Sequence, residues 1–124
     1  MDKASQYANM TTSQLLREYR DMMDAYRTWV NKDIWLHEAE QEEVVELFTI
    51  RDGIHTLVQE LHLQGVAIEE AEIRRIDTKW QKWILSHRDV SFDWPHNDPQ
   101  RPKEHWWEWV DQLSSLTDKQ RSTL

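Results

Sequence analysis

The chain has 124 residues, the usual size of a single domain, and a formal net charge of −8. This acidic balance argues against direct binding to nucleic acid, which needs clustered Lys and Arg, and the absence of cysteine excludes disulfides, thiolate metal sites and thiol nucleophiles. The sequence shows neither the apolar core of a signal peptide nor a run of about 18 apolar residues, so we expect a cytoplasmic protein that does not enter a membrane.

The first predicted helix covers residues 13–31. Its apolar side chains recur every three or four positions, as in an amphipathic helix, at Leu15, Leu16, Tyr19, Met22, Met23, Tyr26, Trp29 and Val30. Thr12 or Ser13 is the expected N-cap, because a hydroxyl there can accept a hydrogen bond from the first turn.

The second predicted helix covers residues 33–63 and has the most regular pattern of the chain. Its apolar residues follow a 3-4-3-4 spacing through Leu47, Ile50, Ile54, Leu57 and Leu61. Gly65 comes next, at the place where a residue in the left-handed conformation commonly ends a helix.

The connection between these two helices allows two structures. In the first, a turn at residues 31–33 separates them. In the second, they are continuous as one helix about 75 Å long, which could bury its apolar stripe only against another chain in a dimer. The sequence favours the turn, because Asp33, Glu40 and Glu43 occupy stripe positions where a long helix needs apolar residues.

A third helix is predicted over residues 67–87, where Glu70 can pair with Arg74 one turn later. Its apolar face carries Ile73, Ile76, Trp80, Trp83 and Ile84. The three prolines then fall between positions 95 and 102, which predicts a proline-rich loop before a last helix over residues 102–115. That helix has Trp106, Trp109, Val110 and Leu113 on one face.

Together these elements predict an all-α protein, a small bundle of about four amphipathic helices with no strands. We expect one domain over residues 1–124, with short flexible ends near residues 1–10 and 117–124. A homodimer is compatible with the continuous 3-4 spacing that runs through the first two helices.

The strongest charge feature is the acidic segment, defined here as residues 38–46. It has five carboxylates and no Lys or Arg, at Glu38, Glu40, Glu42, Glu43 and Glu46. Residues 33–63 contain eight Asp or Glu and one Lys or Arg, a net charge of −7. Acidic residues near a helix start interact well with the helix dipole, which is the simplest explanation. The functional alternative is a docking surface for a basic partner protein.

Two members of the acidic segment raise a packing question. The 3-4 spacing carries Glu40 and Glu43 toward the core, where a buried carboxylate needs a compensating group. Candidates are the side chains of Arg17, Arg20 and Arg51 or a tryptophan N–H.

Two tryptophans are the expected aromatic contacts for a partner. Trp80 and Trp83 form one pair at helical spacing, and Trp106 and Trp109 form another. We expect the two pairs to pack against one another and against Leu57 and Leu61. Trp107 should point away from that face, and Trp94 lies in the predicted loop beside Pro95. Either could be an exposed interaction anchor.

No pattern for catalysis or for a cofactor is present. Asp52 and His55 have a carboxylate–histidine spacing seen in di-iron bundles, but only one copy occurs, and His55 and His62 would lie about 10 Å apart along a helix. We therefore expect a non-enzymatic interaction module without metal or cofactor, acting as an adaptor, regulator or inhibitor. One version is an acidic inhibitor that imitates nucleic acid on a basic groove. The alternative is a bundle that binds a small ligand or metal between Trp-lined helices, with Asp52 and His55 as polar contacts.

Overall fold

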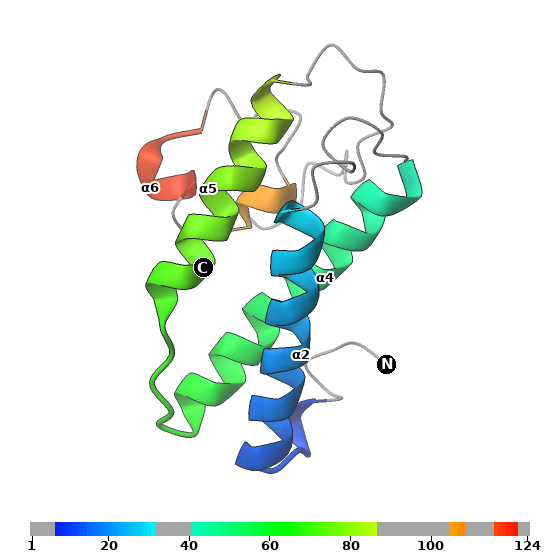
Figure 1. Cartoon of the computed structure of the whole chain (residues 1–124). Helices are drawn as coiled ribbons and strands as arrows, with labels where there is room; N and C mark the ends of the chain where they lie inside the picture. The colour runs from blue at the N-terminus through cyan, green and yellow to red at the C-terminus, as the bar shows by residue number, and fades with distance from the viewer. Residues whose placement is uncertain (1–6, 32–40, 87–104, 109–115, 122–124) are drawn as a thin grey trace.

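The computed structural model describes residues 7–31, 41–86, 105–108 and 116–121 (Figure 1). The helices are α2 (Thr12–Asn31), α4 (Gln41–Leu63), α5 (Glu70–Ser86) and the short α6 (Asp118–Arg121), with a 3-10 turn, η1, at Trp106–Glu108. Over these ranges the chain is all-α, as predicted, and contains no strand. Residues 32–40 and 87–104, which include the predicted proline-rich loop, lie outside the part that the structure describes.

The first two long helices run antiparallel to each other. At one end the Thr12 hydroxyl donates a hydrogen bond to the Gln64 side chain, and Leu15 packs with Leu57 and Leu61. An unbroken helix would hold Thr12 and Gln64 many turns apart, so the chain direction reverses between α2 and α4. The end of α2 at Asn31 agrees with the predicted boundary, whereas dimerisation stays a prediction.

The N-cap of α2 lies one residue before the predicted position. The backbone N–H of Gln14 donates to the Thr11 hydroxyl at 3.2 Å, and the Thr11 N–H donates to the Gln14 side chain at 2.9 Å. This reciprocal pair is a capping box. The prediction of Thr12 or Ser13 as the N-cap was wrong. Thr11 is the cap because Gln14, three residues later in the chain, completes the capping box with it.

The end of α4 was predicted correctly. Gly65 has a φ of 75°, its N–H donates to the His62 carbonyl at 3.0 Å, and the N–H of Val66 donates to the Leu61 carbonyl at 2.9 Å. This is the Schellman arrangement, and Val66 also packs against the cluster that contains Leu61. The turn redirects the chain from α4 toward α5.

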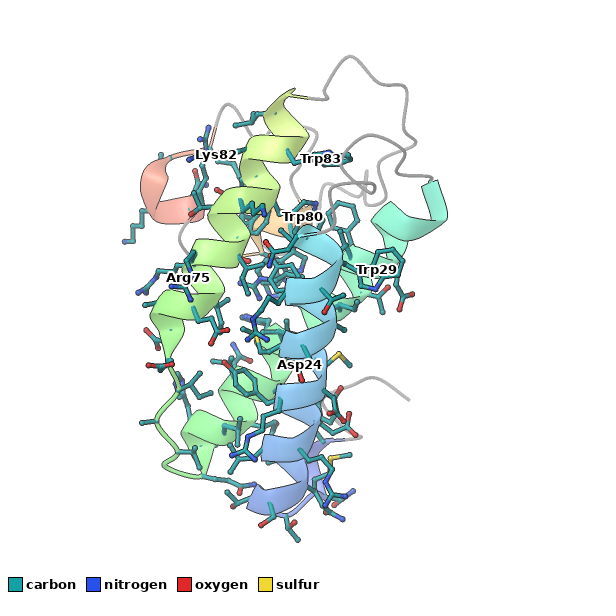
Figure 2. All side chains as sticks on the ribbon, in the orientation of Figure 1. Asp24, Trp29, Arg75, Trp80, Lys82 and Trp83 are labelled. Carbon is teal, nitrogen blue, oxygen red and sulfur yellow. The ribbon has the colours of Figure 1, made fainter. Side chains whose placement is uncertain are left out.

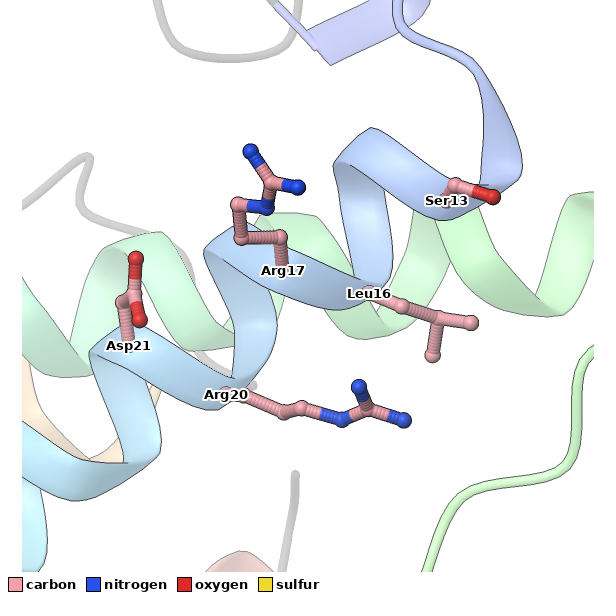
Figure 3. Close-up of a pocket in the computed structure, with 5 residues that line it drawn as sticks. All are labelled: Ser13, Leu16, Arg17, Arg20 and Asp21. Atoms are coloured by element: carbon pink, nitrogen blue, oxygen red, sulfur yellow. The ribbon is translucent and has the colours of Figure 1, made fainter.

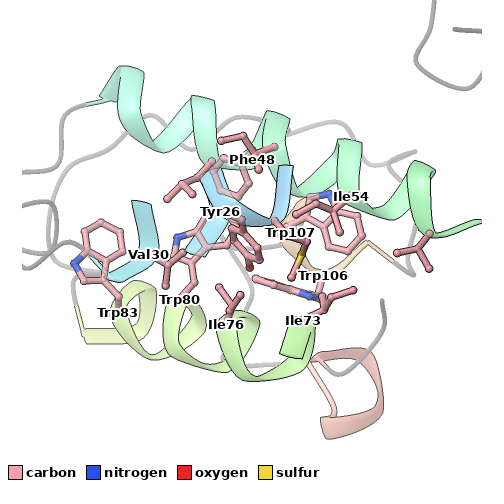
Figure 4. Packing of buried hydrophobic residues seen from close by; sticks show 14 residues of the cluster. Tyr26, Val30, Phe48, Ile54, Ile73, Ile76, Trp80, Trp83, Trp106 and Trp107 are labelled. Carbon is pink, nitrogen blue, oxygen red and sulfur yellow. The ribbon is translucent and has the colours of Figure 1, made fainter. Parts of the chain in front are cut away.

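The centre of the molecule is a cluster of aromatic side chains between α2, α4 and α5 (Figure 4). Its large members are Tyr26, Phe48, Trp80, Trp106 and Trp107. The Trp80 and Trp106 rings meet edge to face at 5.5 Å, a favourable geometry for indoles, so the predicted packing is confirmed for these two tryptophans. Trp109 lies outside the described residues. The predicted packing on Leu57 and Leu61 was wrong, because these residues form a second cluster with Tyr7 and Leu15 at the other end of α4.

Two segments near the C-terminus differ from the sequence expectation. Within the predicted helix 102–115, the described residues form the 3-10 turn η1. Residues 117–121, expected to be a flexible end, include α6, whose first turn has its own capping box between Thr117 and Gln120. The Gln81 side chain donates to the Arg121 carbonyl at 2.9 Å and so joins α6 to α5.

None of the helices that the structure describes combines the length and the apolar character needed to cross a lipid bilayer.

Candidate interaction surfaces

The polar centre of the core is an ion pair between α4 and α5. The Arg51 guanidinium donates through Nε to Asp77 Oδ1 at 2.9 Å and through Nη2 to Oδ2 at 3.1 Å. The side chains are 0% and 2% exposed, respectively. A two-pronged bond of this kind fixes both distance and orientation, so it sets how α4 and α5 face each other.

Asp77 also accepts hydrogen bonds from two aromatic residues. The Tyr26 hydroxyl donates to Oδ1 at 2.5 Å, and the Trp106 indole N–H donates to Oδ2 at 3.4 Å. Four donors from α2, α4 and η1 thus converge on one carboxylate, which offsets the cost of burying its charge. Burial first, and then the negative charge of Asp77, raise the pKa of Tyr26 well above its usual value, so the phenol stays protonated.

Trp107 lies on the other side of Arg51. The guanidinium carbon is 4.1 Å from the centre of the Trp107 ring, and the His105 ring stacks on the same indole at 4.7 Å and 12°. Trp107 has no exposed surface, so the expectation that it is an exposed anchor was wrong. The reason is that η1 sits between two helices: Trp106 reaches Asp77 on α5 while Trp107 reaches Arg51 on α4, and both sides are interior.

The buried ion pair removes one cation from the surface of α4 and one carboxylate from the surface of α5. Arg51 is the only Lys or Arg among residues 33–63, and Asp77 is the only Asp or Glu among residues 73–86. The other formal charges of α4 are all negative, and those of residues 73–86 are all positive, while Glu70 and Glu72 remain in the first turn of α5. This segregation was not evident from the sequence.

The structure places the acidic segment only in part. Glu46 is exposed on α4, while Glu42 and Glu43 belong to the first turns of that helix. Glu42 and Glu46 are one turn apart and therefore share a face. Glu38, Glu40 and Trp94 lie outside the described residues, as do the side chains of Glu42 and Glu43, so the question whether Glu40 and Glu43 are buried is not tested.

The opposite charge gathers on the outer face of α5, called here the basic face. Its residues are the exposed Arg74, Arg75, Lys79 and Lys82. Figure 2 shows Arg75 and Lys82 on the side of α5 away from α2. The neighbouring α6 adds Lys119 and Arg121 beside this face. From the sequence alone, these cations were not singled out as a surface.

A shallow hollow lies on the outer side of α2, with a volume of about 430 Å³ (Figure 3). It is lined by Ser13, Leu16, Arg17, Arg20 and Asp21, all from this one helix. Arg17 and Arg20 extend in different directions in the close-up, so they do not converge on a common point. The hollow is not the predicted site between Trp-lined helices.

The histidines do not form a metal site in the part of the chain that the structure describes. His55 and His105 have ring centres 4.3 Å apart, and His105 Nδ1 is 3.9 Å from Asp52 Oδ1. His62 lies apart, 3.8 Å from Glu70. Among the described residues, no group of three or more His, Asp or Glu side chains is arranged to hold a metal ion. The predicted ion pair of Glu70 with Arg74 is present at 3.5 Å.

Comparison with known proteins adds no relative: no family model, no curated protein and no solved structure matches this chain.

Proposed function

We propose that the protein is a non-enzymatic interaction module that binds a partner protein with a basic surface through the acidic segment, residues 38–46. One observation carries the proposal: Arg51, the only cation that residues 33–63 could offer as an internal counter-charge, is buried against Asp77. Residues 33–63 therefore offer no Lys or Arg at the surface that could pair with the carboxylates of the segment. A partner with clustered Lys or Arg would supply these cations.

The repulsion between carboxylates within the acidic segment supports the same proposal. Glu42 and Glu46 are like charges four residues apart on a helix, a spacing that destabilises an isolated helix by about 0.2–0.5 kcal/mol. The positive end of the α4 dipole offsets this for carboxylates in the first turn only. A basic partner would relieve the repulsion and be drawn in at a distance by the negative field, which raises the association rate.

Trp94 keeps its place in the proposal as an aromatic contact, because a tryptophan in the loop predicted from the sequence can fill a pocket of the partner. Trp107 no longer has that role, because it is buried against Arg51.

Affinity capture from a nuclease-treated lysate tests the proposal. The bait is the native protein or the variant Glu38→Lys/Glu42→Lys/Glu46→Lys, compared at low and moderate salt. A matched control, Asp21→Lys/Glu60→Lys/Glu69→Lys, makes the same change in net charge on other surfaces. We expect a basic protein that is held by the native chain and the control, lost with the variant, and weakened by salt. Equal capture by all three baits, or indifference to salt, would contradict the proposal.

A further inference from the structure

We propose that the outer face of α2 pairs with the same face of a second copy of this chain, with the two helices antiparallel about a two-fold axis. The α2 outer face is defined here by four exposed charged residues, Arg17, Arg20, Asp21 and Asp24. The inference goes beyond the proposed function, because it uses neither the acidic segment nor any residue of α5.

The order of charges makes the α2 outer face complementary to itself. Arg17 and Arg20 come first along the helix, and Asp21 and Asp24 follow. In an antiparallel pair whose axis passes between residues 20 and 21, side chains equally far from the axis lie opposite each other. Arg17 of one copy then lies opposite Asp24 of the other copy, and this contact occurs twice. At the axis, two Arg20 and two Asp21 side chains meet as a group without net charge.

The α2 outer face is turned away from the core of its own molecule. The other side of α2 carries Leu15, Tyr26 and Val30 into the interior, where they are buried. In Figure 1 α2 lies in front of α4, and none of the described elements covers its outer side. A second helix therefore has access to the whole of this face.

The hollow of about 430 Å³ on the outer side of α2 lies on the same face. Three of the four charged residues line it, and the half-buried Leu16 adds an apolar contact. In Figure 3, Arg17 and Asp21 extend toward one edge of the helix and Arg20 toward the other. Side chains placed in this way flank an incoming helix and do not obstruct it.

The charges of the α2 outer face are little used inside the molecule. Within the described part of the chain, Arg17, Arg20 and Asp21 form no ion pair. Asp24 Oδ1 accepts a hydrogen bond from Arg27 at 2.8 Å, but the Asp24 side chain is 74% exposed, so its other oxygen can accept from outside. An arginine one turn before an aspartate is the less favourable order for pairing within a helix. These side chains are therefore available to a second copy.

A second copy fits this pattern better than a partner of one sign. A basic or an acidic protein would meet as many like charges as opposite charges on the α2 outer face, whereas an antiparallel copy meets only opposite ones. The contacts are exposed, so we expect a weak dimer. Each chain has a net charge of −8, and about 100 mM salt screens this long-range repulsion while it affects direct contacts less.

Rearranging the charges tests the pairing at constant composition. The rearranged variant, Arg17→Asp/Asp21→Arg, keeps the net charge and keeps opposite charges one turn apart, but it puts like charges opposite each other across the axis. The inverted variant, Arg17→Asp/Arg20→Asp/Asp21→Arg/Asp24→Arg, exchanges every sign and so restores complementarity. Neither change alters the net charge, so general repulsion between copies is the same in all three proteins.

Sedimentation equilibrium measures the association at about 100 mM salt and at up to about 1 mM protein, where a weak dimer is populated. We expect the native protein and the inverted variant to dimerise with similar affinity. The rearranged variant should associate at least about tenfold more weakly, because opposite charges have become like charges at every contact.

Three results would overturn the inference. They are a native protein that stays monomeric, a rearranged variant that dimerises as tightly as the native protein, and a folded inverted variant that stays monomeric. Circular dichroism checks folding, and if either variant fails to fold, the single change Asp21→Arg, which leaves only cations at the axis, is compared with the native protein instead. Capture of a basic protein through the acidic segment does not depend on this face, so the two proposals fail separately.

Discussion

Arg51 on α4 and Asp77 on α5 are joined by two hydrogen bonds in the interior. Arg51 is the one Lys or Arg of α4, and Asp77 is the one Asp or Glu of residues 73–86. The pair does two things at once. It fixes the facing of the two helices through a planar, two-pronged contact. It also takes from the surface the one cation of α4 and the carboxylate of α5 that lies in sequence among its cations.

Removing one partner of this pair should destabilise the protein strongly. We expect Arg51→Met or Asp77→Asn to lower the free energy of unfolding by about 3–5 kcal/mol, since each leaves a buried charge without its counter-charge. The double variant Arg51→Met/Asp77→Asn should lose clearly less than the sum of the two single losses. Urea denaturation followed by circular dichroism measures this, and strictly additive losses would contradict the coupling.

Tyr26 should make stability fall at high pH. Its pKa is raised in the folded protein by burial and by Asp77, so the folded state holds the phenolic proton where the unfolded state has begun to release it. The contribution is complete below about pH 10, the ordinary pKa of the phenol, and is lost as the pH rises above it, by at most about 1.4 kcal/mol per pH unit.

The variant Tyr26→Phe separates this effect from the other tyrosines. At neutral pH it should be less stable than the native protein by about 1–2 kcal/mol, because the hydrogen bond to Asp77 is gone. Between pH 9 and 11, at about the pKa of an ordinary phenol, its urea midpoint should fall less steeply than the native one. Parallel slopes would show that Tyr26 titrates at the same pH in both states.

Gly65 should tolerate an L-side chain poorly for conformational reasons alone. A Cβ at this position would meet no atom within 4 Å, yet the φ of 75° lies in the left-handed region. We expect Gly65→Ala to lower the free energy of unfolding by about 1 kcal/mol and Gly65→Asn by less, since asparagine enters this region more readily. Thermal unfolding of both variants checks the order, and equal stability of Gly65→Ala and native protein would count against the strain.

The capping box at the start of α2 gives a positional prediction. Thr11→Ala should cost about 1 kcal/mol because it removes the acceptor for the Gln14 N–H. Ser13→Ala, an exposed neighbour that was one of the two caps expected from the sequence, should cost less than half of that. If Ser13→Ala lowers the free energy of unfolding more than Thr11→Ala does, Ser13 and not Thr11 is the N-cap.

The helices were predictable because their apolar spacing is regular, as in Leu47, Ile50 and Ile54, and because Gly65 has a fixed conformational role. The pairing of the two charged residues in the core was not predictable. Asp77 stands on an apolar stripe between Ile73 and Trp80, which marked it as unusual, but nothing in the sequence pairs it with a residue 26 positions earlier. Helical periodicity also gave Trp107 a solvent side, since it assumes a helix with one inner face.

Of the two charged surfaces, only the acidic segment could be predicted from the sequence. The acidic segment is local in sequence, so composition alone reveals it. The basic face is visible only once Asp77 is known to turn inward, because by sequence the cations of α5 appear mixed with a carboxylate at helical spacing.

The packing of η1 also has an optical consequence. The Trp106 ring lies 5.5 Å from Trp80 and 5.9 Å from Trp107, so we expect the excited states of these three indoles, which come from two distant parts of the chain, to be coupled. Coupled transitions of this kind give a paired band in circular dichroism that separate tryptophans lack. The protein therefore carries an intrinsic spectroscopic reporter of whether η1 is seated between α4 and α5, independent of the helical signal.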